Sequence, residues 1–127
     1  MADTNKFSAK YQNKDGKLEV KLNVFIWNDE SVFYAYSPAL DLTGYGKTEN
    51  EAKRSFETTL QEFVKYTTNK KTLFDELEHL GWTVNRKKKR MHVPDLEDLL
   101  KDNETFREIY KREDVKVIKR DVELALA

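Results

Sequence analysis

The sequence has no cysteine among its 127 residues, which excludes a disulfide framework, a cysteine-ligated zinc site and thiol chemistry. It has only two histidines, His79 and His92, and these leave little for a histidine-built metal site. The longest unbroken apolar run, Val32 to Tyr36, is far too short to span a membrane. Because residues 1–6 contain no apolar core of a signal peptide, we expect a cytoplasmic protein.

An excess of charge of either sign is also absent, since 23 basic residues are matched by 23 acidic ones. This balance argues against a protein whose main role is to hold DNA or RNA by bulk positive charge. Hydrophobic residues make up 39% of the chain and aromatic residues 12%, which is too many for a disordered tail. The length fits one domain, with room for a small appended subdomain.

Period-two alternation predicts strands in the first part of the chain. Asp15-Gly16 has the chemistry of a hairpin turn. Gly44 and Gly46 indicate a bulge or a tight bend near a strand end. The segments expected as strands are 7–11, 18–27, 32–36 and 40–46, of which 32–36 is apolar on both faces and therefore central.

The period then changes to that of a helix, expected over about residues 48–67. Thr48 and Glu51 form a capping box at its start. Beyond residue 69 the patterns predict shorter elements: helices at 73–80, 95–101 and 103–112, strands at 82–84 and 91–93, and a terminal strand or hairpin from 115–117 and 122–126.

These patterns predict an α+β fold in two parts. Residues 1–69 are expected to form an antiparallel sheet with one helix packed across it. Residues 70–127 are expected to form a smaller helix and strand subdomain, packed on the first part rather than independent.

Motifs that carry chemistry are missing from the sequence. It has no Gly-x-Ser-x-Gly elbow, no Gly-x-x-x-x-Gly-Lys-[Ser/Thr] phosphate loop and no Gly-x-Gly-x-x-Gly fingerprint. Its carboxylates sit among lysines at helix-surface spacings, as in Glu97-Asp98 and Lys101. We therefore expect no catalytic residue, no metal site and no cofactor.

A basic run consists of Arg86, Lys87, Lys88, Lys89 and Arg90. Five adjacent cations between two short strands form a solvated hairpin tip by default, and the acidic stretch that follows offsets them. The same cations could instead contact phosphates and release counterions. A nucleic-acid-binding regulator that uses this run is therefore the alternative hypothesis.

Aromatic residues are dense in the predicted sheet. Phe25 and Trp27 point away from the face formed by Leu18, Val20, Leu22, Val24 and Ile26. Aromatic residues on a face that the helix does not cover need another cover. We therefore expect Phe25 and Trp27 to lie on a protein-binding surface.

Two motifs point to a family. Residues 34–40 read Tyr-Ala-Tyr-Ser-Pro-Ala-Leu, and residues 46–52 read Gly-Lys-Thr-Glu-Asn-Glu-Ala. Over about residues 18–66 the chain resembles the HicB-like antitoxin family. The resemblance implies a partial RNase-H-like fold, in which a helix crosses a three-stranded antiparallel sheet. Asp41-Leu42-Thr43 departs from that family's Pro-Gly-Cys.

The resemblance also implies a function. Members of the family bind and block a small RNA-cleaving toxin, often as dimers or larger assemblies, and often carry a C-terminal DNA-binding element. We therefore expect a non-enzymatic protein that binds a small toxin-like RNase or a second copy of itself, and so a homo-oligomer. No convincing helix-turn-helix follows the first helix, so DNA binding is not the favoured role.

A second resemblance gives a third hypothesis. The spacing of Leu77, Leu80-Gly81-Trp82 and Arg86 is similar to the start of the partner toxins, which are small domains of the double-stranded-RNA-binding type. Those toxins place Gly-Ser-His soon after the arginine, whereas this sequence reaches His92 through lysines and an arginine. A remote ribonuclease-like activity would use His92.

Overall fold

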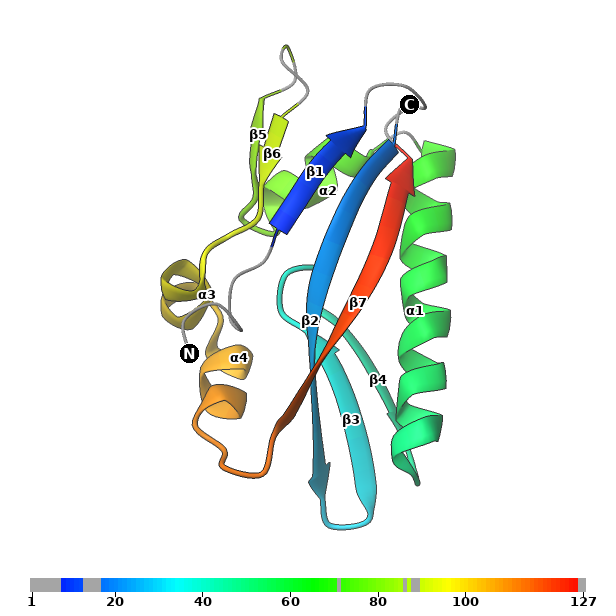
Figure 1. Cartoon of the computed structure of the whole chain (residues 1–127), viewed down its shortest axis with the longest axis vertical. Helices are drawn as coiled ribbons and strands as arrows, with labels where there is room; N and C mark the ends of the chain where they lie inside the picture. Colours follow the sequence, from blue (N-terminus) through cyan, green and yellow to red (C-terminus); the bar gives the residue numbers. More distant parts are fainter. Residues whose placement is uncertain (1–7, 13–16, 71, 86, 88–89, 126–127) are drawn as a thin grey trace.

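The computed structural model describes residues 8–12, 17–70, 72–85, 87 and 90–125, and within them the fold is α+β, as expected (Figure 1). The elements in chain order are β1 (Ser8–Gln12), β2 (Lys17–Asp29), β3 (Val32–Ser37), β4 (Leu42–Gly46), α1 (Glu49–Lys70), α2 (Leu73–His79), β5 (Thr83–Asn85), β6 (Arg90–His92), α3 (Leu96–Asp102), α4 (Glu104–Tyr110) and β7 (Lys116–Ala125).

The long strand β2 organises a five-stranded antiparallel sheet. Its residues 17–21 pair with β1, and its residues 25–29 pair with β3. Both segments overlap the stretch 17–26, which pairs with β7. Since a strand has only two edges, β1 and β3 share one edge of β2 and β7 takes the other. β4 extends the sheet beyond β3.

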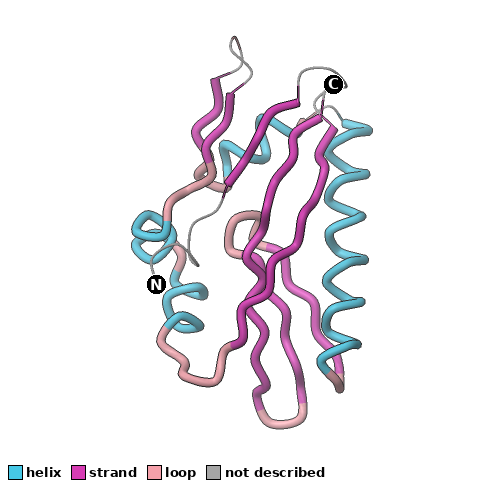
Figure 2. Tube along the Cα trace, in the orientation of Figure 1, coloured by secondary structure: helices cyan, strands magenta, loops and turns pink. Residues whose placement is uncertain are grey.

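Helices cover both faces of this sheet, as Figure 2 shows with strands in the middle and helices on either side. Alternate residues of β2, from Val20 to Ile26, are buried in the larger core together with residues of α1, α2 and the C-terminal strand. Phe25 and Tyr36 point to the other face and form a second core with α3 and α4. The expectation that β3 is covered on both sides is confirmed at Ala35 and Tyr36.

Glycine allows α1 to lie directly on β4. A Cβ atom on Gly44 would stand 2.2 Å from the backbone nitrogen of Phe56, and one on Gly46 would stand 2.4 Å from the Cβ of Glu51. Any side chain at Gly44 would therefore push the helix away. The two glycines accordingly mark this close approach.

The predicted start of α1 is confirmed. The backbone N–H of Glu51 donates to Thr48 Oγ1 at 3.1 Å. The carboxylate of Glu51 reaches back one residue further than in the standard capping box, and accepts from the N–H of Lys47 at 2.9 Å. Ala52, the first inward residue, is fully buried.

The segment after α1, which contains α2 and Trp82, packs against the larger core. Gly81 adopts φ +94°, and the N–H of Trp82 donates to the carbonyl of Leu77 at 2.9 Å, which ends α2 in a Schellman-type cap. The buried indole of Trp82 donates to the carbonyl of Ala39 at 2.8 Å. β5 and β6 follow as an antiparallel pair in which Val84 is opposite Met91.

Helices α3 and α4 begin as predicted, each at a side-chain cap. Asp95 Oδ1 accepts from the N–H of Asp98 at 2.9 Å, and Asn103 Oδ1 accepts from the N–H of Phe106 at 3.0 Å. Of the two C-terminal alternatives, a terminal strand or a hairpin, the strand is confirmed, because β7 runs without a break. This strand pairs with β2 from Lys116 to Ala125, so it belongs to the sheet built by the first part of the chain.

Candidate functional site

The aromatic face expected to bind a partner is covered from within the chain. Phe25 is only 2% exposed, and its ring meets that of Phe106 of α4 edge-on, with centroids 5.1 Å apart. Trp27 is half-buried and stacks on Tyr34 at 5.2 Å. The expectation that Phe25 lies on an open surface is therefore wrong. Of the two residues, only Trp27 retains some exposure to a partner.

The cover is held by polar contacts as well as by rings. The Arg112 guanidinium donates to the carbonyl of Asn28 at 3.1 Å, and so ties the end of α4 to the β2–β3 hairpin. The same guanidinium pairs with Asp114 at 3.0 Å, and this pairing raises the pKa of Arg112 and lowers that of Asp114.

Two residues of the basic run, Lys87 and Arg90, are described, and both belong to the hairpin formed by β5 and β6. Lys87 is exposed in its turn, and Arg90 is the first residue of β6. Arg86, Lys88 and Lys89 lie outside the described residues. His92 is exposed and pairs across the hairpin with Thr83.

A pocket of about 660 Å³ opens where the β3–β4 loop, the end of α2 and the α3–α4 corner meet. Its lining includes His79 and four acidic residues: Asp41, Asp98, Asp102 and Glu104. Such a lining favours a cationic group over an anionic one. The pocket therefore suits a basic side chain better than a phosphate.

One wall of the pocket is held by a chain of hydrogen bonds around Tyr36. The Tyr36 hydroxyl donates to Asp41 Oδ1 at 2.7 Å, and Asn103 Nδ2 donates to the same hydroxyl at 2.8 Å. Burial raises the pKa of Tyr36 well above its ordinary value. The network joins the β3–β4 loop to the start of α4, so the same hydrogen bonds hold both of these pocket-lining segments in place.

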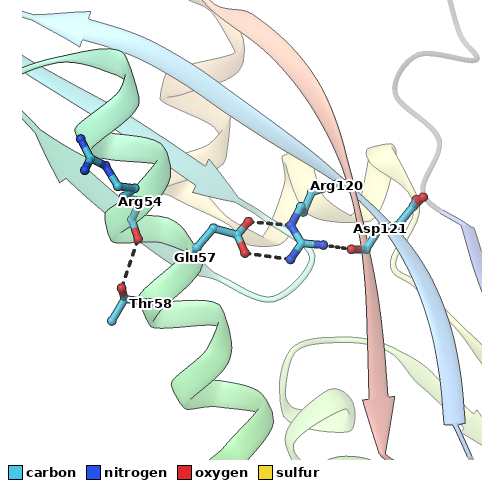
Figure 3. A network of polar contacts seen from close by, with 5 residues as sticks. All are labelled: Arg54, Glu57, Thr58, Arg120 and Asp121. Carbon is cyan, nitrogen blue, oxygen red and sulfur yellow. Dashed lines mark hydrogen bonds and ion pairs between the residues drawn. The ribbon is translucent and has the colours of Figure 1, made fainter.

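A second candidate surface lies along the seam between α1 and β7. Arg120 of β7 donates to Glu57 of α1 through two nitrogens, at 2.5 and 2.7 Å (Figure 3). This bidentate pair raises the pKa of Arg120. A third nitrogen of the same guanidinium contacts the carbonyl oxygen of Asp121.

The seam has a further ion pair at the other end of β7 and remains partly open. Lys116 reaches Glu49 at 2.9 Å, and together with Lys53 it lowers the pKa of that carboxyl. Two crevices flank the Arg120–Glu57 pair, one of about 220 Å³ and one of about 480 Å³. Each crevice has its own apolar lining: the smaller one is lined by Val24, Ala35, Phe56 and Ile118, and the larger one by Leu60, Val64 and Val122.

Neither the acidic pocket nor the seam was predicted from the sequence. The spacing of the acidic residues among lysines predicts a solvated helix surface, and the C-terminal alternation predicts a terminal strand or hairpin without indicating its neighbour. The available signal for the seam was the alternation of Ile118, Val122 and Leu124 with charged residues. That alternation continues through Arg120, which occupies an inward position.

No metal site is found in the part of the chain that the structure describes, where no three His, Asp or Glu side chains converge to hold an ion. No helix among the described residues is long and apolar enough to cross a membrane. Comparisons of the chain with protein-family models, with curated proteins and with solved structures found no match.

Proposed function

We propose that this chain is a non-enzymatic, cytoplasmic protein of the HicB-like antitoxin type, which acts by binding another protein. The partner is a small toxin-like RNase or a second copy of the chain. The proposal rests on the resemblance over about residues 18–66, and one structural observation supports it most.

That observation is the way α1 lies across β2, β3 and β4. This arrangement of three antiparallel strands and one helix is the one that the resemblance implies. The motif residues have matching structural roles. Gly46 allows the helix to approach closely, Thr48 caps it, and Ala52 is its first buried residue.

The test begins with the tagged chain recovered from its native cells under gentle conditions. We expect a stoichiometric protein partner, identified by mass spectrometry, that cleaves RNA when it is isolated. Adding the chain back should stop that cleavage once the two are equimolar. Recovery of a strictly monomeric chain with no stoichiometric partner would contradict the proposal.

Two variants make the inhibition assay sharper. Asp102→Lys changes the charge of the acidic pocket, whereas Glu113→Lys makes the same change at an exposed position outside its lining. Loss of inhibition with the first variant alone would locate the partner at the pocket. Inhibition that survives both variants would locate the partner elsewhere and would leave the proposed function intact.

The alternative function, nucleic-acid binding, is favoured by one observation, the exposed Lys87 in the turn between β5 and β6. Replacing Lys87, Lys88 and Lys89 with glutamine should then weaken binding at low salt and flatten its dependence on salt concentration. If the wild-type chain does not bind nucleic acid at low salt, this alternative is excluded.

A further inference from the structure

Strand β7 forms an edge of the five-stranded sheet. Among the described strands it pairs only with β2, so its outer side offers backbone N–H and C=O groups along ten residues. Long edge strands are sites at which another strand can add. Val117, near one end of β7, is 41% exposed.

The two faces of β7 differ. Ile118, Arg120 and Val122 point toward α1, as the Arg120–Glu57 pair and the linings of the two crevices show. Lys119 and Asp121 are exposed and, by strand alternation, point to the opposite face. The charges on either side of Arg120 are thus opposite in sign.

This order of charges is self-complementary. When two copies of β7 pair antiparallel about a two-fold axis through Arg120, Lys119 of each copy lies opposite Asp121 of the other. The same register places Ile118 opposite Val122 on the face toward α1. Opposite charges and apolar pairs directly across two antiparallel strands both stabilise a sheet.

The two copies of Arg120 meet at the axis, and each already has a carboxylate. Glu57 holds each guanidinium through two bonds, so the central pair of cations is neutralised from within each copy. The guanidinium also contacts the carbonyl oxygen of Asp121, and must turn away from that oxygen when a strand pairs there. Its bonds to Glu57 hold it during that change.

The neighbouring register is less favourable. An axis through Asp121 would set two Asp121 carboxylates side by side and would place Arg120 opposite Val122. That register also places Lys119 opposite Glu123, so the repulsion between the two Asp121 side chains is what makes it less favourable. Like charges directly opposite each other destabilise a sheet.

We propose that the partner on β7 is a second copy of this chain, which joins two five-stranded sheets into one through antiparallel β7 strands centred on Arg120. This deepens the proposed protein-binding function, on which it rests, by naming one partner and its surface. Binding of a toxin-like RNase is a separate event with its own test.

The first test is a charge exchange, measured by size exclusion with light scattering over a series of concentrations. The wild-type chain should have twice the mass of one copy. Lys119→Glu and Asp121→Lys each replace two attractive pairs with two repulsive ones, and should weaken the dimer about tenfold or more. The double variant restores both pairs with reversed signs and should restore the dimer.

Matched controls exclude a general effect of charge or of misfolding. Lys101→Glu and Glu113→Lys make the same charge changes at exposed positions outside β7 and should leave the dimer unchanged. Circular dichroism should show that every variant is folded. Asp121→Lys needs this check most, because Lys21 is its neighbour on β2.

The second test uses the absence of native cysteine to determine the register. A mixture of Lys119→Cys and Asp121→Cys copies should form disulfide-linked heterodimers, because directly opposite residues lie within disulfide reach. Self-linking of Asp121→Cys would overturn the proposed register. A monomeric wild-type chain would overturn the dimer, and the proposed function would still stand if a stoichiometric RNase partner is recovered.

Discussion

Replacing Gly44 with alanine is the sharpest test of the close packing of α1 on β4. The new Cβ would stand 2.2 Å from the nitrogen and 2.6 Å from the Cα of Phe56, and 2.7 Å from the carbonyl oxygen of Ala52. All three atoms belong to the helix backbone, so no side-chain rotation relieves the clash. The helix must retreat by about 1 Å to reach ordinary contact.

That retreat opens the core around Phe56 and Leu60, which are almost fully buried. Overpacking of this kind costs at most about 3 kcal/mol in typical cases, and we expect Gly44→Ala to reach that value. For a domain of this size the melting temperature should fall by about 10 °C. Urea unfolding followed by circular dichroism measures the free energy of unfolding, and a thermal melt measures the melting temperature.

Thr43→Ala is the matched control, because Thr43 precedes Gly44 on β4 and its side chain is exposed. It should change the free energy of unfolding by about 0.5 kcal/mol or less. If Gly44→Ala proved equally mild, the close packing of α1 on β4 would be refuted, and with it the structural meaning of the Gly46-to-Ala52 motif.

Three further predictions concern other parts of the fold. Thr48→Ala should lower the free energy of unfolding by about 1 kcal/mol through the lost cap of α1, and no change would mean that the helix starts elsewhere. Phe106→Ala should lower the free energy of unfolding by about 3 kcal/mol or more. Because Trp27 packs against the same core as Phe25 and Phe106, its fluorescence should also become more accessible to quenchers. Burial raises the pKa of Tyr36 above its ordinary value of 10.0. The contribution of the neutral Tyr36 to the free energy of unfolding is therefore fully present below pH 10.0. It is lost as the pH rises further, because Tyr36 ionises first in the unfolded chain. Tyr36→Phe should remove that part of the loss of stability at alkaline pH, as measured by urea unfolding at a series of pH values on either side of about 10.

Local patterns were sufficient for most of the secondary structure. The hydroxyl of Thr48 and the carboxylate of Glu51 marked the start of α1, and Asp95 and Asn103 marked those of α3 and α4. In each case the signal lies within three residues of the element that it caps. Such signals do not depend on the rest of the fold.

The error at Phe25 has a long-range cause. Alternation correctly placed Phe25 on the face away from α1, but the ring that covers it belongs to Phe106, which is far away in sequence. A single sequence carries no signal that joins those two positions. The covered face was therefore taken for an open one.

The choice between a terminal strand and a hairpin also depends on a distant contact. The alternation at residues 115–117 and 122–126 fits either one. In the structure Arg120 points inward and is accommodated by Glu57, so the strand continues through the charges. An inward charge is predictable only when its partner on another element is known.

The mass of this chain in solution is the most direct test of whether it acts by binding protein. Size exclusion with light scattering would be applied to the purified chain and to the tagged chain recovered from its native cells. We expect twice the mass of one copy, a stoichiometric complex with a small RNase, or both. The mass of a single copy in both samples, with no other protein bound, would contradict it.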